Sequence, residues 1–520
     1  MNANIASHLA NTARLEPDRT AVRDHATGAT LTYGELAERS ARIAAGLLEQ
    51  GLQVGDRVAL LLRNSPEYIE VFFGVATAGL VIVPFNTRLA TKDFAHMLAD
   101  AGCSALITEP HFLAALKDVG PELPLLVDIS NSGGHLGLDD LLGHEPIDVA
   151  FREDSDVCSL MYTSGTTGTP KAVMLSHRAW TSVSETSEAI LSFTPGMSVL
   201  HPAPLTHGAG FLMLPTIRHA GVNVTTPNFD PAVTAELMAS GQVQGMFLVP
   251  SMVRMILDEM AETWRPADGF AWIFYAGSPI EVQTLREASR RFDSRLVQSF
   301  AQMEAPMFLT YLGQDEHRAA LNDDTSDLAR SAGYVIPGRE VLIVDDKGDP
   351  VRAGTVGEVV ARAPQMMLGY WNREEATRET IRDGWLHTGD LGYFDADGKL
   401  FVVDRVKDMI VTGGSNVFAR EVEDVLAHAP GVADVAIIGL PHRIWGEEVT
   451  AVVVAAPGSS LSEGELRDYC RERLAGYKIP KRVIDVDALP RNAYGKVLKR
   501  QLRDALADNG TEPAPSAAGS

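Results

Sequence analysis

The sequence predicts an α/β fold: a large N-terminal domain of layered α/β subdomains with mostly parallel sheets, followed by a small α+β C-terminal domain. Short β-branched runs alternate with longer helical patterns up to about residue 400, which is typical of parallel strands joined by helices. With 520 residues the chain is also too long for one hydrophobic core. Beyond residue 400 the pattern changes to about 110 residues of mixed strands and helices, enough for a second domain.

The first elements follow from local signals. Thr32 and Glu35 have the spacing of a capping box, and apolar residues then recur at helical spacing until Gly51. Strand-like runs follow at residues 57–62 and 79–84, with a second helical stretch between them. A strand–helix–strand order of this kind predicts parallel pairing.

A charged connector separates the two predicted domains. We expect the N-terminal domain to span residues 1–404 and the C-terminal domain residues 405–507. Within the second domain the pattern predicts two β-branched strands flanked by helices. The last segment, residues 508–520, is rich in Pro, Ala, Ser and Gly and is expected to be a disordered tail.

The composition is that of a globular chain and excludes several classes of function. Its formal net charge is −23, and so acidic a surface predicts neither a nucleic-acid partner nor stable membrane insertion. The most apolar window, residues 72–85, is too short to cross a bilayer. Three distant cysteines, Cys103, Cys158 and Cys470, suggest no disulfide framework, and the N-terminus does not resemble a signal peptide. These features favour a cytoplasmic location.

Residues 162–171 form a segment rich in hydroxyls and glycine directly after an apolar strand. Glycine allows close approach to a phosphate, hydroxyls and amides supply donors, and Lys171 adds a cation. The segment is not a Walker loop, because Gly168 and Lys171 are not adjacent. A surface turn is the alternative that composition alone leaves open. The candidate phosphate-binding residues are Thr163, Ser164, Gly165, Thr166, Thr167, Gly168 and Lys171.

Further segments accompany this one along the chain. They are residues 276–279 (AGSP), 300–304 (FAQME), 384–390 (GWLHTGD), 404–414 (DRVKDMIVTGG) and 490–496 (PRNAYGK). In content and order the whole set resembles the signature motifs of the adenylate-forming superfamily, in particular the acyl-CoA and aryl-CoA synthetases. The resemblance extends over nearly the whole chain.

The resemblance implies a two-step reaction that uses ATP, Mg²⁺ and coenzyme A. A carboxylate attacks the α-phosphorus of ATP and expels pyrophosphate, and a thiol then attacks the acyl-adenylate and expels AMP. Because the first step brings an anion to a polyanion, positive charge must offset the developing charge. By resemblance, Lys496 bridges the carboxylate and the α-phosphate, while Glu304 and Thr167 hold Mg²⁺.

The resemblance also assigns the nucleotide contacts. Phe300 would lie against the adenine ring, and Asp390 and Arg405 would contact the ribose. The other residues assigned to this site are Gly277, Ser278, Ala301 and Met303. For the second step, the resemblance implies that the mobile C-terminal domain turns about Lys407. The turn would withdraw the catalytic lysine and bring Gly413 and Gly414 to the acyl-adenylate, opening a tunnel for the pantetheine thiol.

Two polar residues each have two interpretations. His207 occupies the place of a histidine that lies at the mouth of the acyl pocket in many CoA ligases, and a structural histidine is the alternative. Asp230 either meets an amino group of the substrate or caps a helix that begins at Pro231. We favour the cap.

Three residues depart from the family pattern. Met303 replaces a threonine whose hydroxyl contacts the α-phosphate, and losing that hydrogen bond costs roughly 1–2 kcal/mol. Ala301 replaces a glycine that lines the acyl pocket, so a methyl group protrudes there. Phe300 replaces a tyrosine but keeps the stacking face. Because the catalytic residues remain, we expect a working enzyme with an unusual pocket.

We therefore expect an acid–thiol ligase for a hydrophobic carboxylic acid of the aryl, alicyclic or medium-chain class, with coenzyme A as the acceptor. One alternative is a stand-alone adenylating enzyme that passes the acyl group to a carrier protein or an amine, which Met303 and Ala301 favour slightly. The other is a silent adenylate-binding protein, against which the presence of Lys496, Glu304 and Asp390 argues. A homodimer is compatible with each of these functions.

Overall fold

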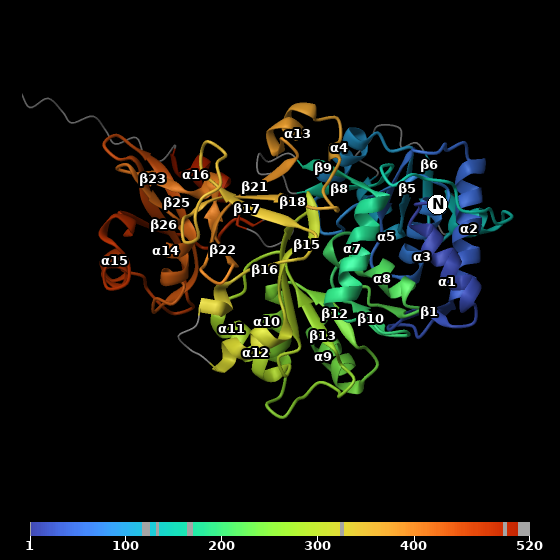
Figure 1. Cartoon of the computed structure of the whole chain (residues 1–520), viewed down its shortest axis with the longest axis horizontal. Helices are drawn as coiled ribbons and strands as arrows, with labels where there is room; N and C mark the ends of the chain where they lie inside the picture. Colours follow the sequence, from blue (N-terminus) through green and yellow to red (C-terminus); the bar gives the residue numbers. More distant parts are fainter. Residues whose placement is uncertain are drawn as a thin grey trace, which may run out of the picture. The chain divides into compact units, whose positions relative to one another are not determined.

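The computed structural model describes residues 2–116, 125–131, 135–163, 170–322, 327–491 and 497–507 of a chain that divides into two compact units (Figure 1). Unit 1 comprises Met1–Leu342, Val360–His387 and Asp397–Leu400, and unit 2 comprises Ile343–Val359, Thr388–Ala396 and Phe401–Ser520. Boundaries fall within the strands β17 (Glu340–Val344), β18 (Gly357–Arg362), β21 (Trp385–Phe394) and β22 (Lys399–Arg405). The single domain boundary expected at residues 404 and 405 stays a prediction, and the tail at 508–520 lies outside the described residues.

Unit 1 contains a sheet whose central strands are parallel. Their spatial order is β1 (Thr20–Asp24), β11 (Val222–Thr225), β10 (Ser198–His201), β12 (Gly245–Leu248), β13 (Trp272–Tyr275) and β14 (Leu296–Gln302). The antiparallel strands are β2 (Thr30–Thr32) beside β1, and β15 (Ala305–Leu312) and β16 (Gly333–Val335) beyond β14. The mostly parallel pairing predicted from the sequence is confirmed for this sheet.

A second sheet of unit 1 is also mostly parallel. Its order is β19 (Gly369–Tyr370), β9 (Lys171–Ser176), β8 (Val157–Thr163), β4 (Val81–Pro84), β3 (Arg57–Leu61), β5 (Ala105–Thr108), β6 (Leu125–Asp128) and β7 (Leu136–Gly137). In this spatial order, every neighbouring pair from β8 to β7 is parallel. Strand β9 is antiparallel to both of its neighbours, β8 and β19. The strands predicted at residues 57–62 and 79–84 are β3 and β4, and they pair in parallel as expected.

Side-chain caps form at the start of several helices of unit 1. The helices of this unit are α1 (Ala6–Leu15), α2 (Tyr33–Glu49), α3 (Pro66–Thr77), α4 (Thr91–Ala101), α5 (Pro110–Leu116), α6 (Leu138–Leu142), α7 (His177–Ile190), α8 (Met213–Arg218), α9 (Pro231–Ser240), α10 (Pro250–Glu259), α11 (Val282–Arg291), α12 (Gln314–Asn322) and α13 (Glu374–Thr380). The predicted capping box forms, since Thr32 accepts from the Glu35 N–H and the Glu35 carboxylate accepts from the Thr32 N–H. Asp230 caps α9 by accepting from the Val233 N–H, as favoured. Helices α9 to α12 pack on one another in chain order (Figure 1).

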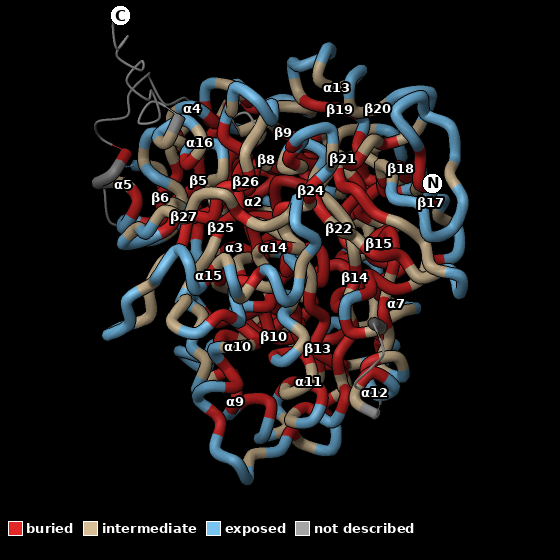
Figure 2. Tube along the Cα trace, turned by 90° about the vertical axis from the view of Figure 1, so that its left-hand side faces the viewer, coloured by how far each residue is buried: buried red, intermediate tan, exposed pale blue. Residues whose placement is uncertain are grey.

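The most apolar part of the sequence lies in the interior of unit 1. Residues 72–85 belong mainly to α3 and β4, and nearly all of α3 is buried. Figure 2 draws the buried stretches of the chain in red. Burial in the core therefore accounts for this window. Among the described residues, no helix is long and apolar enough to cross a membrane.

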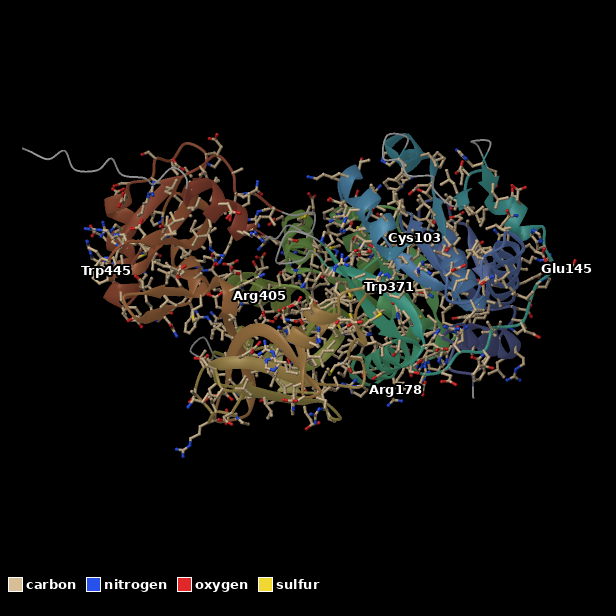
Figure 3. The ribbon with its side chains drawn as sticks, turned by 90° about the horizontal axis from the view of Figure 1, so that it is seen from above. Cys103, Glu145, Arg178, Trp371, Arg405 and Trp445 are labelled. Atoms are coloured by element: carbon tan, nitrogen blue, oxygen red, sulfur yellow. The ribbon has the colours of Figure 1, made fainter. Side chains whose placement is uncertain are left out.

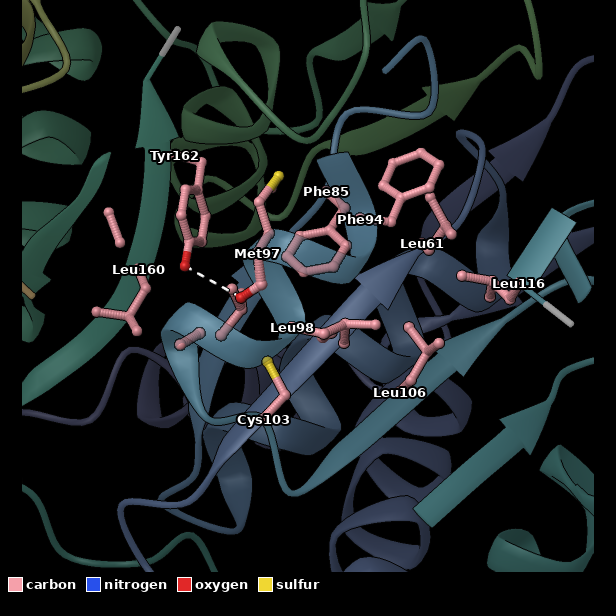
Figure 4. Packing of buried hydrophobic residues seen from close by; sticks show 14 of the residues in the cluster. Leu61, Phe85, Phe94, Met97, Leu98, Cys103, Leu106, Leu116, Leu160 and Tyr162 are labelled. Carbon is pink, nitrogen blue, oxygen red and sulfur yellow. Dashed lines mark hydrogen bonds between the residues drawn. The ribbon is translucent and has the colours of Figure 1, made fainter. Parts of the chain in front are cut away.

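A hydrophobic cluster packs between the second sheet and α4 (Figure 4). Phe85 and Phe94 stack with their ring centroids 6.1 Å apart, and Tyr162 meets Phe85 edge-on. The Tyr162 hydroxyl donates to the Met97 carbonyl at 3.1 Å and to Asp100 at 2.9 Å. These contacts fix β8 at the point where it leads into residues 164–169, the middle of the predicted phosphate-binding segment.

Unit 2 contains a smaller α+β core, as expected. Its sheet has the order β24 (Ser415–Val417), β23 (Ile410–Thr412), β26 (Gly446–Ala455) and β25 (Val432–His442), and β27 (Arg482–Asp485) pairs in parallel with β26. The helices are α14 (Ala419–Leu426), α15 (Glu463–Arg471) and α16 (Lys499–Ala507). Apolar side chains from α14 and α15 pack with this sheet in one cluster, and the α16 residue Leu502 packs with it in a second.

Candidate active site

Several predicted site residues follow the carboxyl ends of parallel strands in the first sheet. His207 follows β10, Gly277 and Ser278 follow β13, and Glu304 follows β14. Because these strands are parallel, their carboxyl ends lie at one edge of the sheet. The chain passes from β10 to β11 on one side and then to β12 on the other, so β10 and β12 flank a topological switch point. His207 therefore lies where open α/β sheets bind ligands.

His207 connects this edge to the second sheet. Its half-buried ring donates to the backbone carbonyl of Tyr162, which stands near the end of β8, and its Nδ1 lies 3.2 Å from the Thr206 hydroxyl. Burial lowers the pKa of His207 to about 4, although the bond to Tyr162 opposes this effect. The imidazole is therefore neutral near pH 7.

Two glycines beside His207 have a packing role. A Cβ on Gly208 would stand 2.8 Å from the Phe247 ring, and a Cβ on Gly210 would collide with the Leu205 carbonyl at 2.1 Å. The structure thus explains both glycines through the tight turn into the 3₁₀ helix η1 (Gly208–Leu212), without reference to a substrate.

Glu304 lies in the tight turn between β14 and β15. Its carboxylate Oε1 accepts a hydrogen bond from the Tyr370 hydroxyl at 2.6 Å, and its backbone carbonyl accepts from the Met367 N–H at 2.8 Å. Within the described part of the chain, no hydrogen bond reaches Oε2. Mg²⁺ is commonly held by one or two carboxylates together with substrate phosphates, so this carboxylate fits such an ion.

Lys171 begins β9 and lies on the other side of Tyr370. Its Nζ is 5.0 Å from the centroid of the Tyr370 ring, within the range of a cation–π contact. Thr163 ends β8, and its hydroxyl donates to the Lys171 carbonyl at 3.4 Å. The other predicted phosphate-binding residues lie outside the described residues: Ser164, Gly165, Thr166, Thr167 and Gly168.

The predicted adenine and acyl residues lie at the same edge of unit 1. Phe300, Ala301 and Met303 are half-buried at the end of β14, whereas Gly277 and Ser278 are exposed. Gly277 has a φ of +92°, a conformation that glycine adopts without strain.

The predicted ribose residues meet in unit 2. Asp390 lies in β21 with 4% of its surface exposed, and Arg405 ends β22. Arg405 is labelled in Figure 3. Its Nε donates to the Asp390 Oδ1 at 2.8 Å. The Asp390 N–H also donates to the Thr388 hydroxyl at 3.1 Å. The buried carboxylate is thus paired with a cation, and the backbone that carries it is fixed by a local turn.

The glycine pair of unit 2 forms a tight hairpin. Gly413 and Gly414 have φ of +57° and +81° and connect β23 to β24, where Thr412 pairs with Ser415. A Cβ on Gly413 would stand 2.9 Å from the indole of Trp445. Lys407 is exposed in the 3₁₀ turn η3 (Val406–Asp408), and Lys496 lies outside the described residues.

Two polar residues that sequence reasoning missed also belong to this region of unit 1. Tyr370 contacts both Glu304 and Lys171, and Asn64 bonds to the segment that leads to His207. A single tyrosine or asparagine carries no local pattern, so only the tertiary structure identifies them. Asn64 has one indirect signal, because it follows the carboxyl end of a predicted strand.

Comparison with known proteins identifies the family. Residues 9–371 match the AMP-binding enzyme family, and residues 421–496 match the AMP-binding enzyme C-terminal domain. The chain belongs to the AMP-binding enzyme family. The resemblance to the adenylate-forming superfamily is therefore confirmed.

Relatives of known activity cover nearly the whole of this AMP-binding enzyme. It is 39% identical over 510 residues to a feruloyl-CoA synthase from Amycolatopsis sp, covering 96% of this chain and 99% of that one. It is 36% identical over 503 residues to the fatty acid–[acyl-carrier-protein] ligase ScoC of Streptomyces coeruleorubidus, covering 95% and 94% of the two chains.

Solved structures of the family have the same fold. The amide bond synthetase McbA from Marinactinospora thermotolerans matches with a TM-score of 0.86 at 28% identity, covering 96% of this chain and 99% of that one. The O-succinylbenzoate coenzyme A synthetase MenE from Bacillus subtilis, solved with ATP and a magnesium ion, matches with a TM-score of 0.84 at 30% identity, covering 96% and 99%.

Proposed function

We propose that this chain is an ATP-dependent carboxylate–CoA ligase. It converts ATP and a hydrophobic carboxylic acid into an acyl-adenylate and pyrophosphate, and then transfers the acyl group to coenzyme A with release of AMP. The observation that carries the proposal is the connection of Glu304 to Lys171 through Tyr370, at the sheet edge that His207 also occupies. A carboxylate for Mg²⁺ and a cation for phosphate are what the first step requires.

In the first step, Glu304 would hold Mg²⁺ together with Thr167, and Lys171 would bind phosphate beside Thr163. When bound, Mg²⁺ offsets the negative charge that pyrophosphate carries away. We assign Lys496 to the contact between the attacking carboxylate and the α-phosphate. Acid substrates would lie near His207, whose neutral ring adds no positive charge to the pocket.

The nucleotide and the second step involve further proposed roles. Phe300 would stack on adenine, with Gly277, Ser278, Ala301 and Met303 beside it, and the Asp390–Arg405 pair would bind the ribose. In unit 2, Lys407 would act as the hinge, and Gly413 and Gly414 would approach the acyl-adenylate when coenzyme A enters. Lys407 suits a hinge because it lies in an exposed turn. The two glycines suit close approach to a ligand because they have no side chains.

A second candidate function changes only the acceptor. Similarity to the carrier-protein ligase ScoC and to the amide bond synthetase McbA favours transfer of the acyl group to a carrier protein or to an amine. Such a protein would share the adenylation step. Coenzyme A, a carrier protein and an amine are therefore compared in one assay.

The test is AMP and pyrophosphate release from ATP and Mg²⁺ with a panel of aryl, alicyclic and fatty acids, each without an acceptor and with coenzyme A, a carrier protein bearing phosphopantetheine, or an amine. We expect rapid AMP release only with coenzyme A, together with a thioester of the matching mass. Lys496→Ala should abolish acid-dependent pyrophosphate release, and Lys347→Ala, at an exposed turn, is the control. An amide or carrier-bound product in place of the thioester would favour the second candidate, and no turnover with any acid would contradict both.

The proposed setting is the cytoplasm. Cys103, Cys158 and Cys470 are free and buried, which supports the proposal of a reducing compartment. A carrier protein and a second copy of the chain are proposed as further partners, to be tested by copurification and by the mass of the native particle.

A further inference from the structure

The segment from Met367 to Trp371 ties two distant parts of unit 1 together. On one side β19 pairs with β9: the Leu368 N–H donates to the Met174 carbonyl and the Trp371 N–H to the Ala172 carbonyl, both at 2.9 Å. On the other side the Met367 N–H donates to the Glu304 carbonyl at 2.8 Å. A five-residue segment therefore fixes the strand that begins with Lys171 against the turn that carries Glu304.

The side chain of Tyr370 repeats this connection at the level of charged groups. Its hydroxyl donates to Glu304 Oε1 at 2.6 Å, and its ring lies under the Lys171 Nζ at 5.0 Å. Only 7% of Tyr370 is exposed.

The backbone of Tyr370 is held as firmly as its ring. Its N–H donates to the Thr377 hydroxyl at 2.9 Å, and that hydroxyl donates to the Arg373 carbonyl. The preceding Gly369 has a φ of +144°, and a Cβ there would stand 2.7 Å from Thr377. The ring is therefore positioned by α13 before any ligand is bound.

We propose that Tyr370 is a positioning residue that fixes the spacing between the Mg²⁺-binding carboxylate of Glu304 and the phosphate-binding ammonium of Lys171. The hydroxyl orients the carboxylate and the ring holds the ammonium, so the two groups are prepared for one triphosphate–metal complex. This inference rests on the proposed function.

The test is ATP binding by calorimetry without any carboxylic acid, in Mg²⁺ and in EDTA, so that no turnover enters the readout. Tyr370→Phe keeps the ring and removes the hydroxyl. We expect it to weaken ATP binding in Mg²⁺ about tenfold, the effect of losing one charge-assisted hydrogen bond, and to leave binding in EDTA unchanged. Tyr370→Leu should weaken binding under both conditions, because Lys171 then also loses its aromatic contact.

Tyr33→Phe is the matched control. Tyr33 is fully buried in α2, and its hydroxyl donates to the Gly221 carbonyl at 2.7 Å, away from the site. It should lower thermal stability without changing the Mg²⁺ dependence of ATP binding. If Tyr370→Phe lost no ATP affinity in Mg²⁺, or lost equal ATP affinity in Mg²⁺ and in EDTA, the inference would be overturned. Retention of the full Mg²⁺ effect in Glu304→Gln would instead overturn the metal role in the proposed function.

Discussion

The side-chain amide oxygen of Asn64 accepts a hydrogen bond at 2.9 Å from the backbone N–H of Leu205, which lies two residues before His207. The same amide donates to the carbonyls of His201 and Ala203 at 2.8 and 2.9 Å. Asn64 follows β3, which lies at the switch point of the second sheet, whereas Leu205 follows β10 at the switch point of the first. One buried side chain thus joins the carboxyl edges of the parallel strands in both sheets.

Asn64→Ala should misplace His207 as well as destabilise the protein. Because hydrogen bonds to three backbone groups disappear, we expect unit 1 to lose roughly 2–4 kcal/mol of unfolding free energy. The KM for the acid should rise several-fold while the KM for ATP changes little. Urea denaturation and steady-state kinetics measure the two effects.

Asn4→Ala is a matched control for this prediction. Asn4 is also a buried amide, donating to the carbonyls of Ala76 and Ala150 and accepting from the Ala6 N–H. It should cost a similar amount of stability and leave the KM for the acid unchanged. Equal kinetic effects of the two substitutions would show that Asn64 acts through stability alone.

Unit 1 should lose stability between pH 6.5 and about 4. Burial lowers the pKa of several histidines from 6.5 to about 4: His8, His177, His201, His207 and His317. Because the folded-state pKa is depressed, the unfolded chain takes up protons first as the pH falls. Each histidine then removes up to about 1.4 kcal/mol of unfolding free energy per pH unit.

Urea unfolding at pH 7.5, 6.5, 5.5 and 4.5 checks this prediction. These histidines should leave the unfolding free energy nearly constant above pH 6.5. Below pH 6.5 the unfolding free energy should decrease as the pH is lowered. His8→Gln should make the fall less steep, and His428→Gln, at an exposed position, is the comparison. A fall equally steep in wild type and His8→Gln would exclude His8 as a contributor.

Arg405→Gln should weaken ATP binding and destabilise unit 2. The substitution removes the guanidinium from the nearly buried carboxylate of Asp390, which should cost roughly 1–3 kcal/mol. We expect the KM for ATP to rise about tenfold if the pair also binds the ribose. Arg471→Gln disrupts an exposed ion pair with Asp468 and should leave both quantities unchanged. An unaltered KM for ATP in Arg405→Gln would exclude the ribose role.

Gly413→Ala should slow acyl transfer while adenylation continues. Alanine strains the backbone at a φ of +57° and also approaches Trp445, so we expect thioester formation to fall at least about tenfold. Exchange of pyrophosphate into ATP reports the first step alone and should persist. Gly458→Ala is the control, because Gly458 has a φ of +81° in the same unit but no heavy atom within 4 Å of the added Cβ. Parallel loss of exchange would place Gly413 in the first step.

Local signals predicted the parts of the fold that depend on neighbours in sequence. The capping box of Thr32 and Glu35 and the cap at Asp230 formed as expected, because each involves residues three apart. The alternation of strands and helices correctly predicted parallel sheets. A resemblance over the whole chain predicted the family and the ATP, Mg²⁺ and coenzyme A chemistry.

Contacts between residues far apart in the sequence could not be predicted in this way. Tyr370 and Glu304 are 66 residues apart, and Asn64 and Leu205 are 141 apart. Nothing in the local composition distinguishes these polar side chains from exposed ones. The packing around Gly208 depends on the same kind of distant contact, because the side chain that approaches it, Phe247, comes from the strand β12.

The burial of every cysteine has a practical consequence for measuring motion in this enzyme. Burial raises the pKa of Cys103 to about 12 and raises those of Cys158 and Cys470, so few thiolates form near neutral pH. A maleimide dye should therefore react slowly with the native protein. One new cysteine at an exposed position of each unit would accept a fluorophore selectively, and energy transfer between the two dyes would then test the proposed turn about Lys407 in the otherwise unaltered chain.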